Sequence, residues 1–214
     1  MLKILGRRSS SNVQKVLWCC AELGLDYEQE EIGRESGGND TPEFLRKNPN
    51  GTVPVIVDDG LVLWESNAIV RYLAAKDGGG RLYPTALSVR ALAERWMAWQ
   101  LAVLGPAFTP IFHGLVRDPP EKRDHAKIAA ARDDVEAKLE MLDRYLGETE
   151  YVAGDDFTMG AIPVGIYAYR WYEFDIERKE LANLERWYAA LQQRAPYRDH
   201  VMVGLGGSPT GLPG

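Results

Sequence analysis

The segment from Asn48 to Leu73, NPNGTVPVIVDDGLVLWESNAIVRYL, constrains the fold more than any other part of the chain. Asp59-Gly60 separates two apolar runs, which predicts a two-residue β-hairpin because both central residues tolerate positive φ. Glu65-Ser66 follows, where a strand gives way to a helix whose unpaired N–H groups attract a carboxylate. Pro54 opens the first strand, and in the cis form it would turn the backbone of Val53 outward to pair with an extended peptide. The segment therefore predicts two half-sites for a small acidic peptide.

The residues before this segment predict two further strands, each followed by a helix. An apolar strand at 3–6 leads through the polar loop 7–12 into a helix that ends at Gly24. A weaker strand at 25–32 precedes a short helix that has Thr41 as its N-cap and proline at its first position. Parallel strands require helical crossovers, and the hairpin makes the last pair antiparallel. This order predicts one mixed four-stranded sheet.

After Pro84 the pattern is purely helical. We expect a helix at 88–104, with a break or kink at Gly105-Pro106 and Pro110. The next helix is expected to open at Pro119-Pro120 and to carry an amphipathic stripe. The stripe consists of Ile128, Ala131, Val135, Leu139, Leu142 and Leu146.

Two more helices are expected near 158–172 and 181–194, and the Gly- and Pro-rich end at 204–214 is expected to lack regular structure. The fold class is α/β followed by all-α. The expected units are an α/β domain at 1–79, a linker at 80–86 and an all-helical domain at 87–214.

Composition excludes several classes of protein. The chain has 214 residues, of which 45% are hydrophobic and 26% charged, which is typical of a soluble globular protein. The net charge is −6 and no basic run occurs, so nucleic acid is not an expected partner. No apolar run approaches the roughly 20 residues of a membrane span, and the start lacks the order of a signal peptide, so we expect no membrane contact and a cytoplasmic location. The cysteines, Cys19 and Cys20, are adjacent in a predicted helix and are expected to be buried structural thiols.

Taken together and in order, four motifs resemble the cytosolic glutathione S-transferase family, in particular its bacterial serine/asparagine-type, theta- or nu-like members. The motifs are SSSNVQKVLWCCAELGLDYE, NPNGTVPVIVDDG, WESNAIVRYL and, more weakly, GDDFTMGAIPVG. The resemblance covers essentially the whole chain. It implies an N-terminal thioredoxin-like βαβαββα domain that holds glutathione, a C-terminal helical-bundle domain that supplies most of the second-substrate pocket, and a homodimer.

The resemblance also assigns the glutathione site. It implies that the backbone of Val53 pairs with the cysteinyl residue, with Pro54 cis, and that Glu65 and Ser66 hold the γ-glutamyl end. Many family members carry a lysine immediately before the Val-Pro pair, where this chain has Thr52.

That departure leaves the contact of the glycyl carboxylate open. Asn50, Lys47 and Arg34 are the remaining candidates, because a basic or amide side chain from the preceding loop usually makes it in the family.

The family places its thiol-activating residue in the loop that here reads Ser9, Ser10, Ser11 and Asn12. A free thiol with a pKa of about 8.5 is only a few per cent ionised at neutral pH, and lowering that pKa by about two units requires roughly 2.7 kcal/mol. A hydroxyl donor and the start of the first helix, both directed at the sulfur, can supply that stabilisation, and a tyrosine cannot provide the hydroxyl because none precedes Tyr27. The resemblance favours Ser10, with Asn12 as an amide donor to the sulfur and Ser11 as the alternative.

By the same resemblance, the electrophile pocket lies between the loop that begins at Arg7 and the kinked helix from Trp96 to Arg117. Aromatic residues at helical spacing are more often core than pocket, so Trp96 and Trp99 are weaker candidates than the proline-kinked half. The expected lining residues are Arg7, Phe108, Phe112 and His113. His113 has no partner at metal-ligand spacing, so no metal site is expected and glutathione is the only co-substrate implied.

In the helical half, Thr158 is expected to cap a helix, although Ala161 replaces the aspartate that usually completes the family's capping box. On that basis Ala161→Asp is expected to raise the melting temperature.

Three functions fit the sequence. The leading one is a glutathione transferase that directs the glutathione thiolate at a small hydrophobic electrophile. A glutathione-dependent disulfide or peroxide reductase is the second. A non-catalytic glutathione-binding or regulatory module is the third, and retention of the Glu65-Ser66 pair argues against it.

Overall fold

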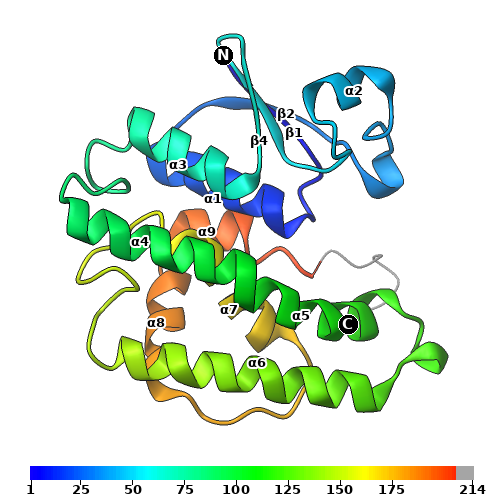
Figure 1. Ribbon diagram of the computed structural model, residues 1–214, viewed down its shortest axis with the longest axis vertical. Helices are drawn as coiled ribbons and strands as arrows, with labels where there is room; N and C mark the ends of the chain where they lie inside the picture. The colour runs from blue at the N-terminus through cyan, green and yellow to red at the C-terminus, as the bar shows by residue number, and fades with distance from the viewer. Residues whose placement is uncertain (206–214) are drawn as a thin grey trace.

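The computed structural model describes residues 1–205 of the chain. Its first part contains a four-stranded sheet with the order β2-β1-β3-β4 (Figure 1). The strands are β1 (Leu2–Leu5), β2 (Tyr27–Glu30), β3 (Val55–Asp58) and β4 (Leu61–Trp64). β1 and β2 are parallel, and β3 is antiparallel to both β1 and β4. The predicted mixed sheet is confirmed, although β2 is shorter than the predicted strand.

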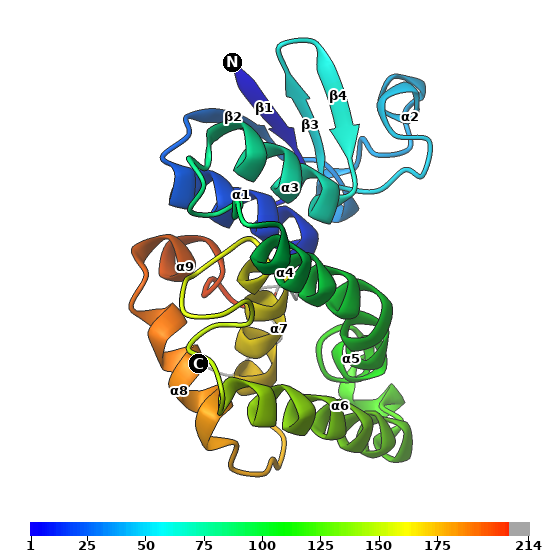
Figure 2. The same cartoon turned by 60° about the vertical axis from the view of Figure 1, so that its left-hand side comes forward.

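Helices α1 and α3 lie side by side between the sheet and the helical part of the protein (Figure 2). The helical elements of this first part are α1 (Ser11–Leu23), the 3-10 turn η1 (Arg34–Ser36), α2 (Pro42–Lys47) and α3 (Ser66–Asp77). The sequence correctly predicted the start of α2 and the end of α1. Thr41 Oγ1 accepts a hydrogen bond of 3.2 Å from the backbone N–H of Phe44, and Gly24 ends α1 in the left-handed conformation. Asp59 and Gly60 form the hairpin turn with φ angles of 48° and 89°.

The rest of the described chain is helical. Its elements are α4 (Leu87–Trp99), the π-helical turn η2 (Gln100–Leu104), α5 (Gly105–Phe112), the π-helical turn η3 (His113–Arg117), the 3-10 turn η4 (Pro120–Lys122), α6 (His125–Leu146), α7 (Ala161–Glu173), α8 (Ala182–Gln192) and α9 (Ala195–His200). The predicted apolar stripe of α6 faces the core, with Ala131 partly buried and the other five residues buried.

The helical rod from α4 to η3 continues through both proline positions (Figure 1). Proline lacks an N–H and its ring crowds the carbonyl four residues earlier, which normally interrupts an α-helix. Here Pro106 lies in the first turn of α5 and Pro110 inside it, and the wider turns η2 and η3 flank that segment. The rod therefore adjusts by local widening, and the predicted break does not occur.

Two helix starts differ from the predictions. The helix expected at Pro119-Pro120 begins at His125, because Asp124 accepts a 3.0 Å hydrogen bond from the N–H of Lys127 and provides the cap. The prediction that Thr158 caps a helix is wrong. Helix α7 begins at Ala161, and the buried hydroxyl of Thr158 has no hydrogen-bond partner among the described residues.

Helix α9 was not predicted, and no element was expected at residues 195–203. Of the predicted irregular end at 204–214, residues 206–214 lie outside the described residues.

One large hydrophobic core extends through both parts of the protein, and Trp18 of α1 is fully buried in it. Its ring lies 4.7 Å from that of Tyr197 and 5.5 Å from that of Phe157, measured between centroids. A Cβ added to Gly165 of α7 would lie 2.9 Å from the Trp18 ring, so only glycine permits this approach. Helix α1 therefore packs against α3 on one side and against the helical part on the other.

The two cysteines belong to this core, as predicted. Cys19 and Cys20 are free and fully buried, and burial raises the pKa of both thiols, that of Cys20 to about 12. Neither thiol is therefore available as a thiolate nucleophile. None of the described helices combines the length and apolar character needed to cross a membrane.

Candidate functional site

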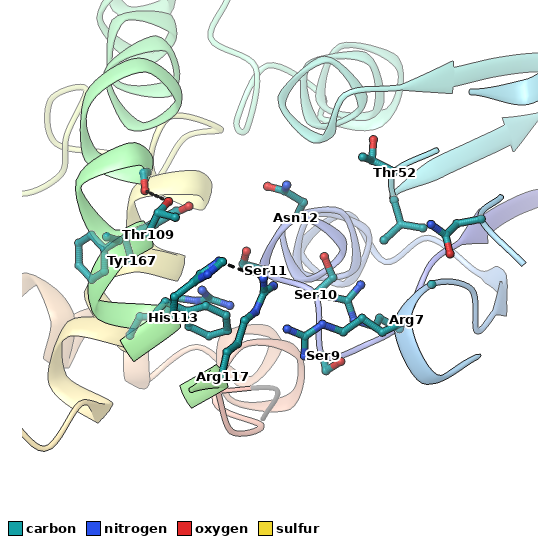
Figure 3. Close-up of a pocket in the computed structure, with 18 of the residues that line it drawn as sticks. Arg7, Ser9, Ser10, Ser11, Asn12, Thr52, Thr109, His113, Arg117 and Tyr167 are labelled. Atoms are coloured by element: carbon teal, nitrogen blue, oxygen red, sulfur yellow. Dashed lines mark hydrogen bonds between the residues drawn. The ribbon is translucent and has the colours of Figure 1, made fainter. Parts of the chain in front are cut away.

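A cavity of about 480 Å³ opens between the start of α1 and the rod formed by α5 and η3 (Figure 3). One wall is the polar loop before α1, with the loop around Val53 beside it, and the other wall is helical. The predicted site residues that line it are Arg7, Ser10, Ser11, Asn12, Thr52, Val53, Phe108, Phe112 and His113. Asn50, Pro54, Glu65 and Ser66 do not line this cavity.

Ser10 is the N-cap residue of α1 and is buried against the cavity. Its carbonyl accepts a 2.8 Å hydrogen bond from the N–H of Gln14, but its hydroxyl makes no capping bond. The hydroxyl therefore remains available to a ligand, and the first N–H groups of a thirteen-residue helix point the same way. Ser11 is half-buried one residue further on. Both a hydroxyl donor and a helix N-terminus can thus face an anion in the cavity.

Asn12 and Ser66 connect α1 to the start of α3. The Ser66 hydroxyl donates to Oδ1 of Asn12 at 3.2 Å, which leaves the amide nitrogen of Asn12 free to donate elsewhere. Ser66 also accepts from the Lys15 ammonium at 3.5 Å, and Lys15 donates to Oε1 of Gln100 at 2.8 Å. This network places Ser66 next to the cavity, and it ties the sheet half to the helical half.

Lys15, the lysine of this network, has a strongly lowered pKa. Its side chain is 1% exposed, and burial, followed by the charge of Arg170, lowers its pKa to about 7, against the opposing influence of Glu65. Lys15 was not predicted as a site residue, although an isolated charge on the buried face of an apolar helix is a visible signal.

The peptide bond between Val53 and Pro54 is cis, as expected. Among the described residues no backbone hydrogen bond uses the N–H or C=O of Val53, so both are available to an extended peptide. Asn48 holds the approach to this turn, because its amide nitrogen donates to the carbonyl of Thr52 at 2.8 Å.

The three candidates for binding the glycyl carboxylate differ in whether they line the cavity. The side-chain amide of Asn50 donates to Asn48 at 2.9 Å, and the ammonium of Lys47 pairs with Glu43 at 2.8 Å. Arg34 lines the cavity beside Val53.

Glu65 is exposed, and it adopts a φ of 71° as the N-cap residue of α3. Such a conformation is costly for a residue other than glycine, asparagine or aspartate. The side chain makes no capping bond, so capping does not explain the conformation.

The helical wall is partly aromatic and strongly basic. Phe108 and Phe112 line it as predicted, whereas Trp96 packs edge-on against Trp99 at 5.1 Å outside the cavity. Sequence reasoning missed four side chains of this helical wall, namely Thr109, Arg117, Tyr167 and Arg170. Two of them had visible signals, because Arg117 lies one helical turn after His113 and Arg170 is the single basic residue of α7.

The arginines of the cavity lower one another's pKa values. Burial is the largest cause for Arg7, Arg117 and Arg170, and neighbouring arginines contribute to each. The pKa of Arg170 falls to about 10. The cavity therefore carries an excess of positive charge that an anion would relieve.

No group of three or more histidine, cysteine or acidic side chains suitable for a metal ion occurs within residues 1–205.

A thioredoxin-like sheet with a cis-proline turn, followed by a helical domain that closes a cavity at the start of α1, defines the class of thioredoxin-fold proteins with an added helical domain. Residues 1–75 match the family described as "Glutathione S-transferase, N-terminal domain". The chain belongs to the glutathione S-transferase family. It is 43% identical over 205 residues to glutathione S-transferase GstB of Escherichia coli K12, which covers 95% of this chain and 99% of GstB.

Solved structures agree with this assignment. The theta class glutathione S-transferase of Xanthomonas axonopodis pv. citri, with glutathione bound, is 48% identical and superposes with a TM-score of 0.92, over 95% of this chain and 98% of that one. Glutathione transferase F7 of Populus trichocarpa is 25% identical with a TM-score of 0.84, over 96% of this chain and 99% of that one.

Proposed function

We propose that this protein is a glutathione transferase in which Ser10 and the N-terminus of α1 stabilise the glutathione thiolate. The observation that carries the proposal is that the uncapped hydroxyl of Ser10 and the unpaired backbone of Val53 line one cavity. The backbone of Val53 would pair with the cysteinyl residue and so direct its sulfur toward Ser10. The free amide nitrogen of Asn12 would provide a second donor.

The two charged ends of glutathione would lie on either side of the cysteinyl residue bound at Val53. Glu65 and Ser66 would hold the γ-glutamyl end at the start of α3, where Ser66 already contacts Asn12. Arg34 would take the glycyl carboxylate, because it lines the cavity beside Val53 whereas Asn50 and Lys47 do not.

The thiolate would attack a small electrophile held against Phe108 and Phe112. A carbon–sulfur bond forms, and either a leaving group departs with its electron pair or an activated double bond takes up the charge and then a proton. The thiol proton passes to solvent. We also propose that the protein works as a cytoplasmic homodimer, which agrees with exposed apolar residues on β4 and along the rod, at Leu61, Val62 and Leu101.

The test is the ionisation of bound glutathione, followed by its thiolate ultraviolet absorbance as pH is raised. Ser10→Ala removes one charge-assisted hydrogen bond of about 1.5–3 kcal/mol, so the pKa of the bound thiol should rise by about one to two units. Ser11→Ala is the matched control and should leave that pKa nearly unchanged. If only Ser11→Ala raises it, Ser11 activates the thiol instead.

The two other functions give different results in two assays. Turnover of chlorodinitrobenzene supports a transferase, and turnover of a small mixed disulfide without it supports a reductase. Retention on immobilised glutathione with neither activity would support a binding module.

A further inference from the structure

Two arginines of the helical wall enclose the ring of Phe112 (Figure 3 shows Arg117 beside His113). The guanidinium carbon of Arg170 lies 4.5 Å from the ring centroid, and that of Arg117 lies 5.1 Å from it. Arg117 also contacts Nε2 of His113 at 3.0 Å, which requires that nitrogen to accept the hydrogen bond and the imidazole to be neutral. The side chains come from η3 and α7, so two helices bring these positive charges together.

Within residues 1–205, no carboxylate forms an ion pair with either of these arginines. Arg170 is 8% exposed, and its guanidinium makes no ion pair or hydrogen bond within the described part of the chain. Arg117 likewise forms no ion pair there. A buried cation without a partner is costly, and cations in direct proximity add mutual repulsion. The nitrogens of Arg170 are not among the fully enclosed unpaired atoms, and the residue lines the cavity, so a ligand can reach them.

Glutathione accounts for other basic residues of the cavity. A Cβ on Gly33 would lie 3.5 Å from Nη1 of Arg7, which places that guanidinium over the loop next to Val53. Arg34 would therefore lie on the side where the peptide would bind, and so would Arg7, which the sequence had assigned to the electrophile pocket. Arg117 and Arg170 lie on the helical side, at the aromatic wall where the proposed electrophile would rest.

We propose that the second substrate is an electrophile that carries a carboxylate or a similar compact anion, and that Arg117 and Arg170 bind this anion while Phe112 contacts its apolar body. The inference rests on the proposed transferase function. A guanidinium pair recognises a planar anion through bidentate hydrogen bonds, which would orient the electrophilic carbon toward the sulfur near Ser10. Accumulated positive charge would also raise the local concentration of anionic substrates.

The test compares two aryl halides that differ in a single group, chloronitrobenzoate and chloronitrobenzamide. In both, the thiolate forms a carbon–sulfur bond and chloride leaves with the electrons of the carbon–chlorine bond. Rates are divided by the uncatalysed rates with free glutathione, because the amide and the carboxylate activate the ring differently. The normalised kcat/KM should be at least about tenfold higher for the benzoate, which corresponds to about 1.4 kcal/mol.

Arg170→Met and Arg117→Met should each remove about tenfold or more of that preference while leaving KM for glutathione within about twofold. Arg81→Met replaces an exposed arginine outside this cavity and should change neither. Far-ultraviolet circular dichroism checks that each variant is folded. If Arg170→Met does not fold, Arg117→Met on the exposed η3 turn carries the test.

An equal normalised rate for the amide, or a preference that survives both substitutions, would overturn the inference and leave the transferase function intact. Failure to turn over any halide, chlorodinitrobenzene included, would instead overturn the proposed function. In that case the anion site is tested by nitrobenzoate, which has no leaving group. It should raise the melting temperature of the wild type but not of Arg170→Met, and no shift in the wild type would exclude the site.

Discussion

Lys15 should make the stability of this protein rise with pH across the neutral and alkaline range. In the folded state its side chain is 1% exposed and has a pKa of about 7, because burial and the charge of Arg170 disfavour the ammonium form. In the unfolded chain the pKa returns to about 10.4. Between these values the unfolded state binds one more proton than the folded state, so raising the pH favours folding.

The expected magnitude follows from the two pKa values. The slope is about 1.4 kcal/mol per pH unit where the folded side chain is neutral and the unfolded one is charged. Allowing for partial titration near pH 7, the free energy of unfolding should gain about 2 kcal/mol between pH 7 and pH 9 from this one residue. Lys15→Met removes that gain, since methionine fills similar space without a titratable group. The lost hydrogen bonds to Gln100 and Ser66 cost about 1–2 kcal/mol at every pH and do not affect the slope.

The measurement is urea unfolding of wild type and Lys15→Met at fixed protein concentration, in steps of pH from 6 to 9. The difference in free energy between them should change by about 2 kcal/mol in favour of the wild type as the pH rises. Lys122→Met replaces an exposed lysine and should give a difference that does not vary with pH. A constant difference for Lys15→Met would refute the reasoning, because it would mean that Lys15 stays charged when buried.

Three further predictions concern stability and assembly. Gly165→Ala should lower the free energy of unfolding by about 1–3 kcal/mol in chemical denaturation, because the added methyl group would lie 2.9 Å from the Trp18 ring. Ala161→Asp should raise the melting temperature by a few degrees, since its carboxylate would give the unpaired hydroxyl of Thr158 an acceptor; a fall would show that burial of the charge costs more. Leu101→Glu, at a 56% exposed position on the rod, should shift light-scattering mass toward the monomer, and an unchanged mass would place the proposed dimer interface elsewhere.

Local chemistry predicted the parts of the fold that depend on a few neighbouring residues. The Asp59-Gly60 turn and the Thr41 cap are cases where one side chain or one φ angle decides the structure. Prolines predicted the helix limits less well, because the effect of a proline on a helix depends on whether the neighbouring turns can widen around it. Pro110 is accommodated by wider turns on either side of its helix. The helix expected at Pro119-Pro120 begins only after Asp124, whose carboxylate accepts a hydrogen bond from an N–H group of the first turn.

The candidate site was predictable where it uses the backbone and less so where it uses buried charge. Val53, Pro54 and Ser10 stand in motifs. The bond before Pro54 is cis, and Val53 and Ser10 line the same cavity. Arg170 and Lys15 come from different helices, and each is buried against a residue distant in sequence: Lys15 contacts Gln100, and Arg170 contacts Phe112. Helical periodicity assigns a charged residue to the solvent side, so only the packed structure reveals the basic character of the cavity.

The packing of Trp18 between the two halves also sets an order of events during synthesis. Its ring leaves the ribosome early, yet Phe157, Gly165 and Tyr197, which cover it, are made far later. At about 5–20 residues per second the nascent chain must keep this indole unpaired for roughly 10–40 s. The core around Trp18 can therefore be completed only when α9, which carries Tyr197, has emerged.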